Sequence, residues 1–282
     1  MNILTFDIEE WFHILDNNST KNEKDWVNYE SRIHSNMAKI YQILDATNSK
    51  ASFFVLGWIA EKHPELIREI SDRGHEIGSH THLHQLVYEQ DRNIFYQDVD
   101  RSIKTLEDVT GKKVKMFRAP GFSITETNKW AFEVLYELGI EIDSSIFPAQ
   151  RSHGGFAQYG AAEPSILKYN GTQLKEFPIN AHSVLTKPII FSGGGYFRLF
   201  PYNTIKSFTE KSSYIMSYFH PRDFDPTQPM IKALSLQRKF KSYVGLRHTE
   251  KKLITWLNDF NFTDISDAND SIDWYKVKQF EL

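Results

Sequence analysis

The 282-residue sequence contains no cysteine. This excludes disulfide bonds, thiolate metal ligands and a cysteine nucleophile, so any metal or acid–base chemistry must use His, Asp and Glu. Long apolar runs are also missing, since no uninterrupted stretch approaches the ~18 residues that a transmembrane helix needs. Neither sign of charge is in excess. With 33 Lys and Arg against 36 Asp and Glu, the net charge of −3 provides no electrostatic basis for binding nucleic acid.

The residues that are present describe a globular protein. Hydrophobic residues make up 40% of the chain and aromatic residues 14%, which is enough for a full core. The first residues, MNILTFDIEEWFH, are acidic where a secretory signal is basic and then apolar, so we expect a cytoplasmic protein. Eleven histidines direct attention to metal and proton-transfer chemistry.

Apolar runs of strand length alternate with segments of helical spacing along most of the chain. We expect strands at residues 2–7, 51–57, 76–79, 114–117 and near 142, and helices at residues 33–44, 64–74, 95–111, 123–139, 203–212 and 246–260. The capping-box pattern from Ser123 to Glu126 is expected to open the fourth helix. Regular alternation predicts an α/β fold with a parallel sheet, either open or closed into a barrel.

The region from Ala149 to Pro201 differs from the rest of the chain. Helical spacing disappears there, and glycines, including the run from Gly193 to Gly195, interrupt short apolar pieces. We expect hairpins and loops over about 149–200. No repeat, low-complexity stretch or linker divides the sequence, so residues 1–282 are predicted to form one domain.

Carboxylates and histidines follow the predicted strands. Period-2 alternation sends Asp7 and Glu9 to one face at the end of the first strand and Glu10 to the other. If the segment after the third strand is helical, His80 and His84 lie at i and i+4 and face one point. With a carboxylate from the first strand they complete a two-His-one-carboxylate set with open positions, which is typical of a metal site.

Three more ionisable residues end later strands. Arg118 and Asp143 follow neighbouring strands and are expected to form a bidentate ion pair. His220 ends a late strand. Because parallel strands present their carboxyl ends at one edge, these groups are predicted to lie near the metal site.

These segments, taken in order, resemble the five motifs of the polysaccharide deacetylases, the NodB-homology domain of carbohydrate esterase family 4. The matching segments are TFDIEEWFH, SHTHLH, FRAPGF, DSSIFP and YFHP. The segments DIEEWFH, GGGYFR and YFHPRDFDP are similar in sequence to members of the branch found with bacterial exopolysaccharide and surface-glycan gene clusters. The resemblance covers most of the chain and implies a distorted, incompletely closed (β/α) barrel.

The resemblance also implies a metal centre. Glu9, His80 and His84 are expected to hold a divalent metal, most often zinc, with cobalt, nickel or manganese as alternatives. Most family members have adjacent aspartates in the first motif, whereas Ile8 follows Asp7 here, so the second acid must be Glu9 or Glu10. The strand alternation favours Glu9.

The acid–base roles come from the same resemblance. Asp7 is implied as the general base that takes a proton from water, held by Arg118, which Asp143 supports. His220 is implied as the general acid that protonates the leaving amine.

Aromatic residues near the motifs are the candidates for stacking on a sugar ring. They are Trp11, Phe12, Phe122, Tyr196 and Phe197. Gly121 and Phe122 also depart from the family, where an aromatic and then a glycine usually follow Pro120.

The expected substrate is an N-acetylated sugar in a lipid-linked or nucleotide-linked precursor of an O-antigen, capsule or exopolysaccharide. Two alternatives remain open at this point. One is a cyclic imide or ureide hydrolase of the same superfamily, and the other is a non-catalytic glycan-binding protein.

Overall fold

The computed structural model describes residues 1–15, 17–149, 154–160, 162–184 and 187–282. The helices are α1 (Glu23–Trp26), α2 (Ile33–Thr47), α3 (Gly57–Lys62), α4 (Pro64–Asp72), α5 (Arg92–Thr110), α6 (Trp130–Glu137), α7 (Gly194–Leu199), α8 (Tyr202–Glu210), α9 (Leu236–Tyr243), α10 (Leu246–Asp259) and α11 (Ile265–Ser271). The strands are β1 (Asn2–Ile3), β2 (Thr5–Ile8), β3 (Ser52–Val55), β4 (Glu76–Ser79), β5 (Met116–Phe117), β6 (Ile142–Asp143), β7 (Ser165–Tyr169), β8 (Thr172–Glu176), β9 (His182–Val184), β10 (Lys187–Ile189), β11 (Ile215–Met216) and β12 (Lys278–Glu281).

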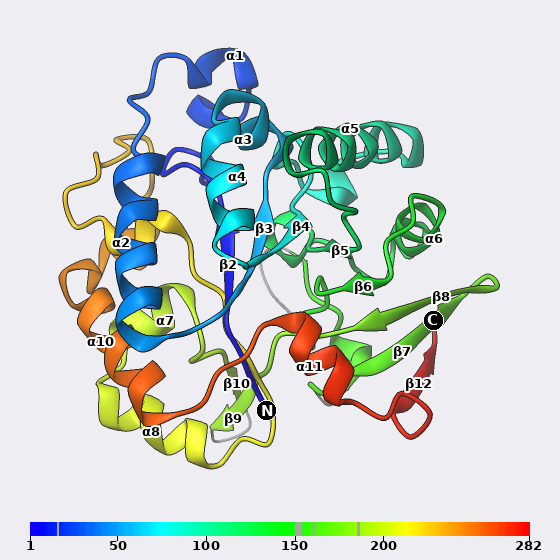
Figure 1. The fold of residues 1–282 in the computed structure, drawn as a ribbon. Helices are drawn as coiled ribbons and strands as arrows, with labels where there is room; N and C mark the ends of the chain where they lie inside the picture. Colours follow the sequence, from blue (N-terminus) through cyan, green and yellow to red (C-terminus); the bar gives the residue numbers. More distant parts are fainter. Residues whose placement is uncertain (16, 150–153, 161, 185–186) are drawn as a thin grey trace.

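Eight strands form one sheet in the order β12-β7-β8-β6-β5-β4-β3-β2. Every neighbouring pair is parallel except the hairpin of β7 and β8. A bridge between Phe6 and Phe219 continues the sheet from β2 toward β11, which pairs in parallel with β1. Within the described ranges no ladder joins β11 to β12, so the barrel is distorted and incompletely closed, as predicted (Figure 1).

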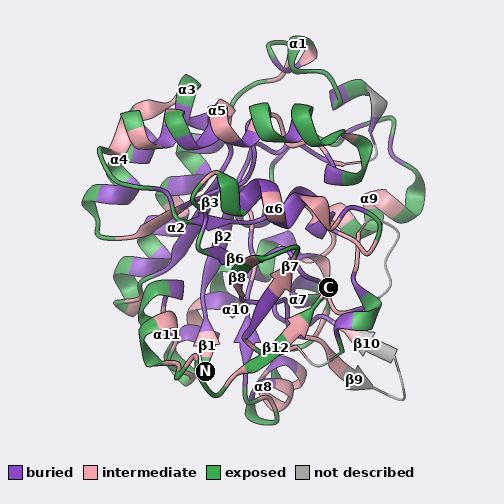
Figure 2. Ribbon diagram, turned by 90° about the vertical axis from the view of Figure 1, so that its right-hand side faces the viewer, coloured by how far each residue is buried: buried purple, intermediate pink, exposed green. Residues whose placement is uncertain are grey.

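The core lies between the sheet and the inner faces of the helices around it. In α2, the apolar residues Ile33, Met37 and Ile40 repeat at helical spacing, and all three are buried. The strands β2 and β3 are buried along their whole length, because helices cover one side and the barrel interior the other. Figure 2 shows the buried residues concentrated on the sheet and the exposed ones on the outer helix surfaces.

Two sequence predictions about local structure were wrong. The glycine run that was expected to lie in a loop leads into helix α7. Gly193 lets the backbone pack closely against Tyr218, since a Cβ at this position would lie 2.1 Å from the Tyr218 carbonyl oxygen. Helix α6 begins at Trp130 and not near Ser123, whose hydroxyl instead accepts the Val87 N–H at 3.0 Å.

The expected hairpins between residues 149 and 200 are present in part. β7 and β8 turn at Asn170 and Gly171, both with positive φ, and join the main sheet. β9 and β10 form a separate antiparallel pair. The predictions for residues 150–153, 161 and 185–186 lie outside the described residues. Elsewhere in the described part, no helix has the length and apolar character that a bilayer crossing requires.

Candidate active site

The predicted site residues meet at one edge of the sheet. Asp7 lies in β2, His80 follows β4, Arg118 follows β5 and Asp143 ends β6, and these four strands are parallel. His220 reaches the same edge because the Phe6–Phe219 bridge places its segment beside β2. The parallel topology therefore explains why residues so far apart in sequence converge.

Arg118 fixes the carboxylate of Asp7. Its Nη1 donates to Asp7 Oδ1 at 2.7 Å and to the Thr5 hydroxyl at 2.7 Å. The guanidinium is fully buried, and its carbon lies 4.1 Å from the centre of the Phe54 ring. Since Asp7 is also buried, the ion pair holds one oxygen in place and leaves Oδ2 for other partners.

Asp143 does not form the predicted bidentate pair with Arg118. Arg118 Nη2 donates instead to the Ser144 hydroxyl at 2.9 Å, and Nε donates to the Ser144 carbonyl. Asp143 accepts from the Ser145 hydroxyl at 2.6 Å, and that hydroxyl accepts the Ala119 N–H at 2.8 Å. Asp143 therefore supports the backbone beside Arg118 and not its guanidinium.

A buried carboxyl pair lies beneath this support. Asp143 is hydrogen-bonded to Glu176, a residue that the sequence analysis did not select. Burial and the charge of Asp143 raise the pKa of Glu176 well above its usual range. Glu176 thus lies behind Asp143, away from the metal-ligand cluster, and belongs to the structural support of the site.

Glu9, His80 and His84 form the predicted cluster of metal-ligand type. One ligand atom from each lies within 4.8 Å of the others. His84 Nε2 lies 2.7 Å from Glu9 Oε2, a buried oxygen that has no hydrogen bond in the structure. His80 Nδ1 faces the Arg118 carbonyl oxygen at 2.7 Å, which leaves Nε2 for the cluster. An orphaned carboxylate oxygen and two imidazole nitrogens fit a divalent cation.

The two histidines converge through a turn, and the predicted helical segment is absent. Thr81 and His84 have positive φ values of 69° and 55°. Asp98 on α5 accepts the backbone N–H groups of His82 and Leu83 at 2.7 and 3.1 Å, which fixes the turn. The convergence of His80 and His84 was therefore correct, but its predicted mechanism was wrong.

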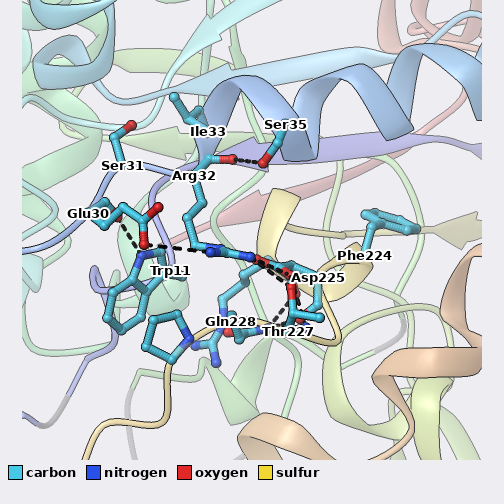
Figure 3. A network of polar contacts seen from close by, with 12 residues as sticks. Trp11, Glu30, Ser31, Arg32, Ile33, Ser35, Phe224, Asp225, Thr227 and Gln228 are labelled. Carbon is cyan, nitrogen blue, oxygen red and sulfur yellow. Dashed lines mark hydrogen bonds and ion pairs between the residues drawn. The ribbon is translucent and has the colours of Figure 1, made fainter.

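Glu10 points away from this cluster, as the strand alternation predicts. Its Oε1 accepts the backbone N–H groups of Arg32 and Ile33 at 2.9 and 3.1 Å, at the start of α2. Figure 3 shows the neighbouring contacts of Arg32, whose Nε donates to Asp225 Oδ2 at 2.5 Å. These bonds tie the segment after β2 to the segment after His220.

Replacing Glu10 tests this assignment. We expect Glu10→Ala to lower the free energy of unfolding by about 1–3 kcal/mol, because the first N–H groups of α2 lose their acceptor. Metal binding should stay unchanged. Chemical denaturation of this variant and of Glu30→Ala, whose side chain is 73% exposed, measures the difference. Equal stability of the two variants would contradict the capping role.

His220 is oriented by a carboxylate. Its Nδ1 lies 3.2 Å from Asp223 Oδ2, and Asp223 is in turn 3.4 Å from Arg198 Nε on α7. This arrangement turns His220 Nε2 toward the site, at 3.9 Å from Asp7 Oδ2 and 3.8 Å from Glu9 Oε1. Asp223 is not among the predicted site residues, although its position three residues after His220, at the start of a short helix, is a capping signal.

The charges around the site set its protonation states. Burial alone would raise the pKa of Glu9, but His84 and His220 lower it to about 2. Burial lowers the pKa of His80 to about 4. Burial would also lower the pKa of His220, but the bond to Asp223 and the charge of Glu9 raise it to about 9. At neutral pH the site therefore holds a carboxylate, a neutral His80 and a protonated His220.

A cavity of about 330 Å³ borders the cluster at His84. Its lining combines apolar side chains, among them Trp26 and Leu83, with polar ones such as Asn17 and Gln85. Because small-molecule pockets begin at about 300 Å³, this cavity is large enough to hold a small ligand or part of a larger one.

Most of the predicted stacking residues do not reach this space as exposed rings. The buried ones are Trp11, Phe12, Phe122 and Phe197. Phe197 packs edge-on against Phe219 in the core, so its prediction as a sugar platform is wrong. Trp11 donates its indole N–H to the Glu30 carbonyl and packs against Phe12, and the ring of Phe122 is enclosed beside Tyr218. Tyr196 is 48% exposed, so its ring is accessible and its predicted role in stacking on a sugar stays a prediction.

Comparison with known proteins finds two matches to family models. Residues 15–141 match the family model described as polysaccharide deacetylase. The N-terminal part of the chain is thus similar to the polysaccharide deacetylase domain. Residues 144–270 match a second model, a domain of unknown function named DUF3473. The deacetylase match does not include Asp7, Glu9 or His220. These three residues are linked to the matched region by their contacts with His84 and Arg118 and with one another.

Two relatives of this region are named as peptidoglycan-N-acetylglucosamine deacetylases. A peptidoglycan-N-acetylglucosamine deacetylase of Bacillus cereus is 34% identical over 96 residues, which cover 34% of this chain and 35% of that protein. The peptidoglycan-N-acetylglucosamine deacetylase PgdA of Listeria monocytogenes is 28% identical over 103 residues, which cover 36% of this chain and 21% of PgdA. The chain therefore aligns with about a third or less of each of these two proteins.

Solved structures agree on the fold. A Mycobacterium smegmatis protein assigned to the polysaccharide deacetylases superposes with a TM-score of 0.67 at 20% identity, over 99% of this chain and 92% of that one. A Bacillus anthracis pseudoenzyme of carbohydrate esterase family 4 superposes with a TM-score of 0.52 at 11% identity, over 100% of this chain and 69% of that one. The first match spans both family regions, and the predicted fold class is confirmed.

Proposed function

We propose that the protein is a metal-dependent hydrolase that removes the acetyl group from an N-acetylated sugar of a bacterial polysaccharide or its precursor. The observation that carries the proposal is the convergence of Glu9, His80 and His84 beside Asp7 and His220. A ligand set, a base and an acid at one edge of the sheet are the parts that amide hydrolysis needs.

Glu9, His80 and His84 would hold the metal, with zinc as the first choice and cobalt, nickel or manganese as alternatives. When bound, such a metal lowers the pKa of a water molecule and polarises the acetamide carbonyl. The chain contributes the orientation of its ligands. His80 is fixed by its contact with the Arg118 carbonyl oxygen, and Arg118 also holds Asp7.

Asp7 and His220 divide the proton transfers. Asp7 Oδ1 is engaged by Arg118, so Oδ2 is the oxygen that accepts the proton of the attacking water. His220 presents Nε2 on the same side and is protonated at neutral pH, so it gives a proton to the leaving amine. Asp143 stabilises this arrangement through Ser145 and the backbone at Ala119.

Two observations support the proposed substrate class: the names of the relatives and the sequences of the motifs. The named relatives act on N-acetylglucosamine in peptidoglycan, and the segments DIEEWFH and YFHPRDFDP are similar to the surface-glycan branch. We propose a lipid-linked or nucleotide-linked glycan precursor in the cytoplasm, upstream of an O-antigen or related polymer. Cell fractionation tests the location, and recovery only from the periplasm would contradict it.

Acetate release tests the function. We expect the zinc-loaded protein to release acetate from N-acetylated oligosaccharides, and His220→Ala to lose most of this activity. Binding without release would favour the glycan-binding protein. Hydrolysis of a cyclic imide in place of the sugars would favour the small-amide hydrolase.

The alkaline side of the pH profile tests Asp223. Because Asp223 raises the pKa of His220, Asp223→Asn lowers that pKa, and the loss of activity with rising pH begins about 1–3 pH units lower. Asp225→Asn is the matched control, since Asp225 binds Arg32 and not His220. The comparison is the pH dependence of kcat for the two variants. An unchanged alkaline limb in Asp223→Asn would contradict the assignment of His220 as the acid.

A further inference from the structure

The outer face of helix α9 is apolar and uncovered. None of the residues from Leu236 to Tyr243 is buried. Leu236 and Phe240 are 85% and 56% exposed, and their spacing of four residues places them on one face. Met230, just before this helix, is 57% exposed. Large apolar side chains gathered in this way are typical of an interaction surface, and Figure 2 shows α9 at the edge of the molecule.

The helix is nevertheless firmly attached on its inner side. The preceding residues Ile231 and Leu234 are buried in a cluster with aromatic residues of the N-terminal loop. Arg238 Nη2 donates to the Leu15 carbonyl at 3.0 Å, and the Tyr243 hydroxyl accepts the Ile231 N–H at 2.9 Å. The exposed face is therefore a fixed feature of the fold.

Basic residues surround this apolar face. Residues 232–252 contain seven Lys and Arg and a single acid, Glu250, in a chain whose net charge is −3. Lys232, Lys241 and Arg247 are exposed, and Lys239 is half-buried. Within the described ranges, these four have no carboxylate within ion-pair distance. Positive charge is thus concentrated beside exposed Leu and Phe.

We propose that this face of α9, with Met230, docks onto a bilayer surface that contains anionic lipid. Apolar side chains on one helix face, flanked by Lys and Arg, are the combination that binds the lipid interface. An acidic protein surface would satisfy the charges, but it would leave Leu236 and Phe240 exposed.

The docking face is connected to the candidate active site. Arg198 donates to the carbonyl oxygens of Lys241 and Ser242 at the end of α9, at 2.9 and 2.8 Å. The same guanidinium faces Asp223, which orients His220. Docking of α9 would hold this side of the site near the bilayer. Resting on the proposed function, this geometry favours a glycan attached to a membrane lipid as the substrate.

Vesicle flotation with the full chain tests the proposal. We expect binding to vesicles of phosphatidylcholine with phosphatidylglycerol and little binding to phosphatidylcholine alone. Leu236→Asp/Phe240→Asp should weaken this binding about tenfold or more. Salt at about 1 M, where the Debye length is about 3 Å, should release the wild type. The matched control is Val27→Asp/Tyr275→Asp, which places two acids at exposed apolar positions elsewhere.

Three results would overturn the proposal. The first is absence of wild-type binding to the anionic vesicles, and the second is equal loss in the control variant. The third is a concentration-dependent dimer that Leu236→Asp/Phe240→Asp abolishes, because a second copy would then be the partner. Acetate release from a soluble oligosaccharide should be unchanged in the α9 variant. If the wild type releases no acetate, the proposed function is contradicted, but the vesicle-binding result for α9 is not affected.

Discussion

Asp7→Asn should lower kcat for acetate release by about a thousandfold while the metal stays bound. The amide keeps the size of the side chain and an oxygen that accepts from Arg118 Nη1, so the ion-pair position is filled. The second oxygen, which lies 3.9 Å from His220 Nε2, becomes an amide nitrogen that accepts no proton. The loss therefore falls on the chemical step and not on folding.

Parallel measurement of kcat and metal content decides between two roles for Asp7. A base variant retains its metal, whereas a ligand variant loses metal and activity together. Glu10→Gln is the matched control, because this acid on the same segment caps α2 and faces away from the cluster. Activity within a few-fold of wild type in Asp7→Asn would exclude the base role.

Arg118→Lys should unfold at a temperature lower by roughly 10 °C, which corresponds to about 3–5 kcal/mol. The guanidinium joins Asp7 and Thr5 on one side to Ser144 on the other, and it is fully buried. A lysine carries the charge but lacks the planar fork that reaches both sides. One set of buried partners is therefore left without its donor, and activity falls because Asp7 is no longer held.

Thermal unfolding compared with Arg73→Lys measures this effect. Arg73 pairs with Asp45 and Glu69 at the surface, where the same substitution should change stability by less than about 1 kcal/mol. Equal melting temperatures for the two variants would show that Arg118 is not the hub of the buried network.

The strand pattern predicted which acid enters the site. Alternation alone placed Asp7 and Glu9 on one face and Glu10 on the other, and the structure has Glu10 at the start of α2. Parallel topology similarly predicted that Arg118 and His220 would reach the same edge. These predictions succeed because period and strand direction are properties of the sequence itself.

Other features depend on contacts that no local pattern contains. The turn that brings His80 to His84 needs Asp98 from α5 to accept its N–H groups. Asp143 binds Ser145 in preference to Arg118, because Ser144 already occupies the guanidinium. Phe197 faces the core because glycine-rich α7 packs its backbone against Tyr218. In each case contacts between segments distant in the sequence determine the hydrogen-bond partner or the direction of the side chain, and no local sequence pattern distinguishes the alternatives.

Metal content is the measurement that tests the account most directly. Elemental analysis after reconstitution with zinc should compare wild type, Glu9→Gln and His84→Ala with two controls, Glu10→Gln and His34→Ala. The second control removes a surface group of metal-ligand type, formed with His63 and Glu65, so that metal bound there is recognised. We predict about one equivalent that is lost in the first two variants and kept in both controls. Wild-type protein that holds no metal, or Glu9→Gln and His84→Ala variants that each hold as much metal as wild type, would contradict the proposed centre.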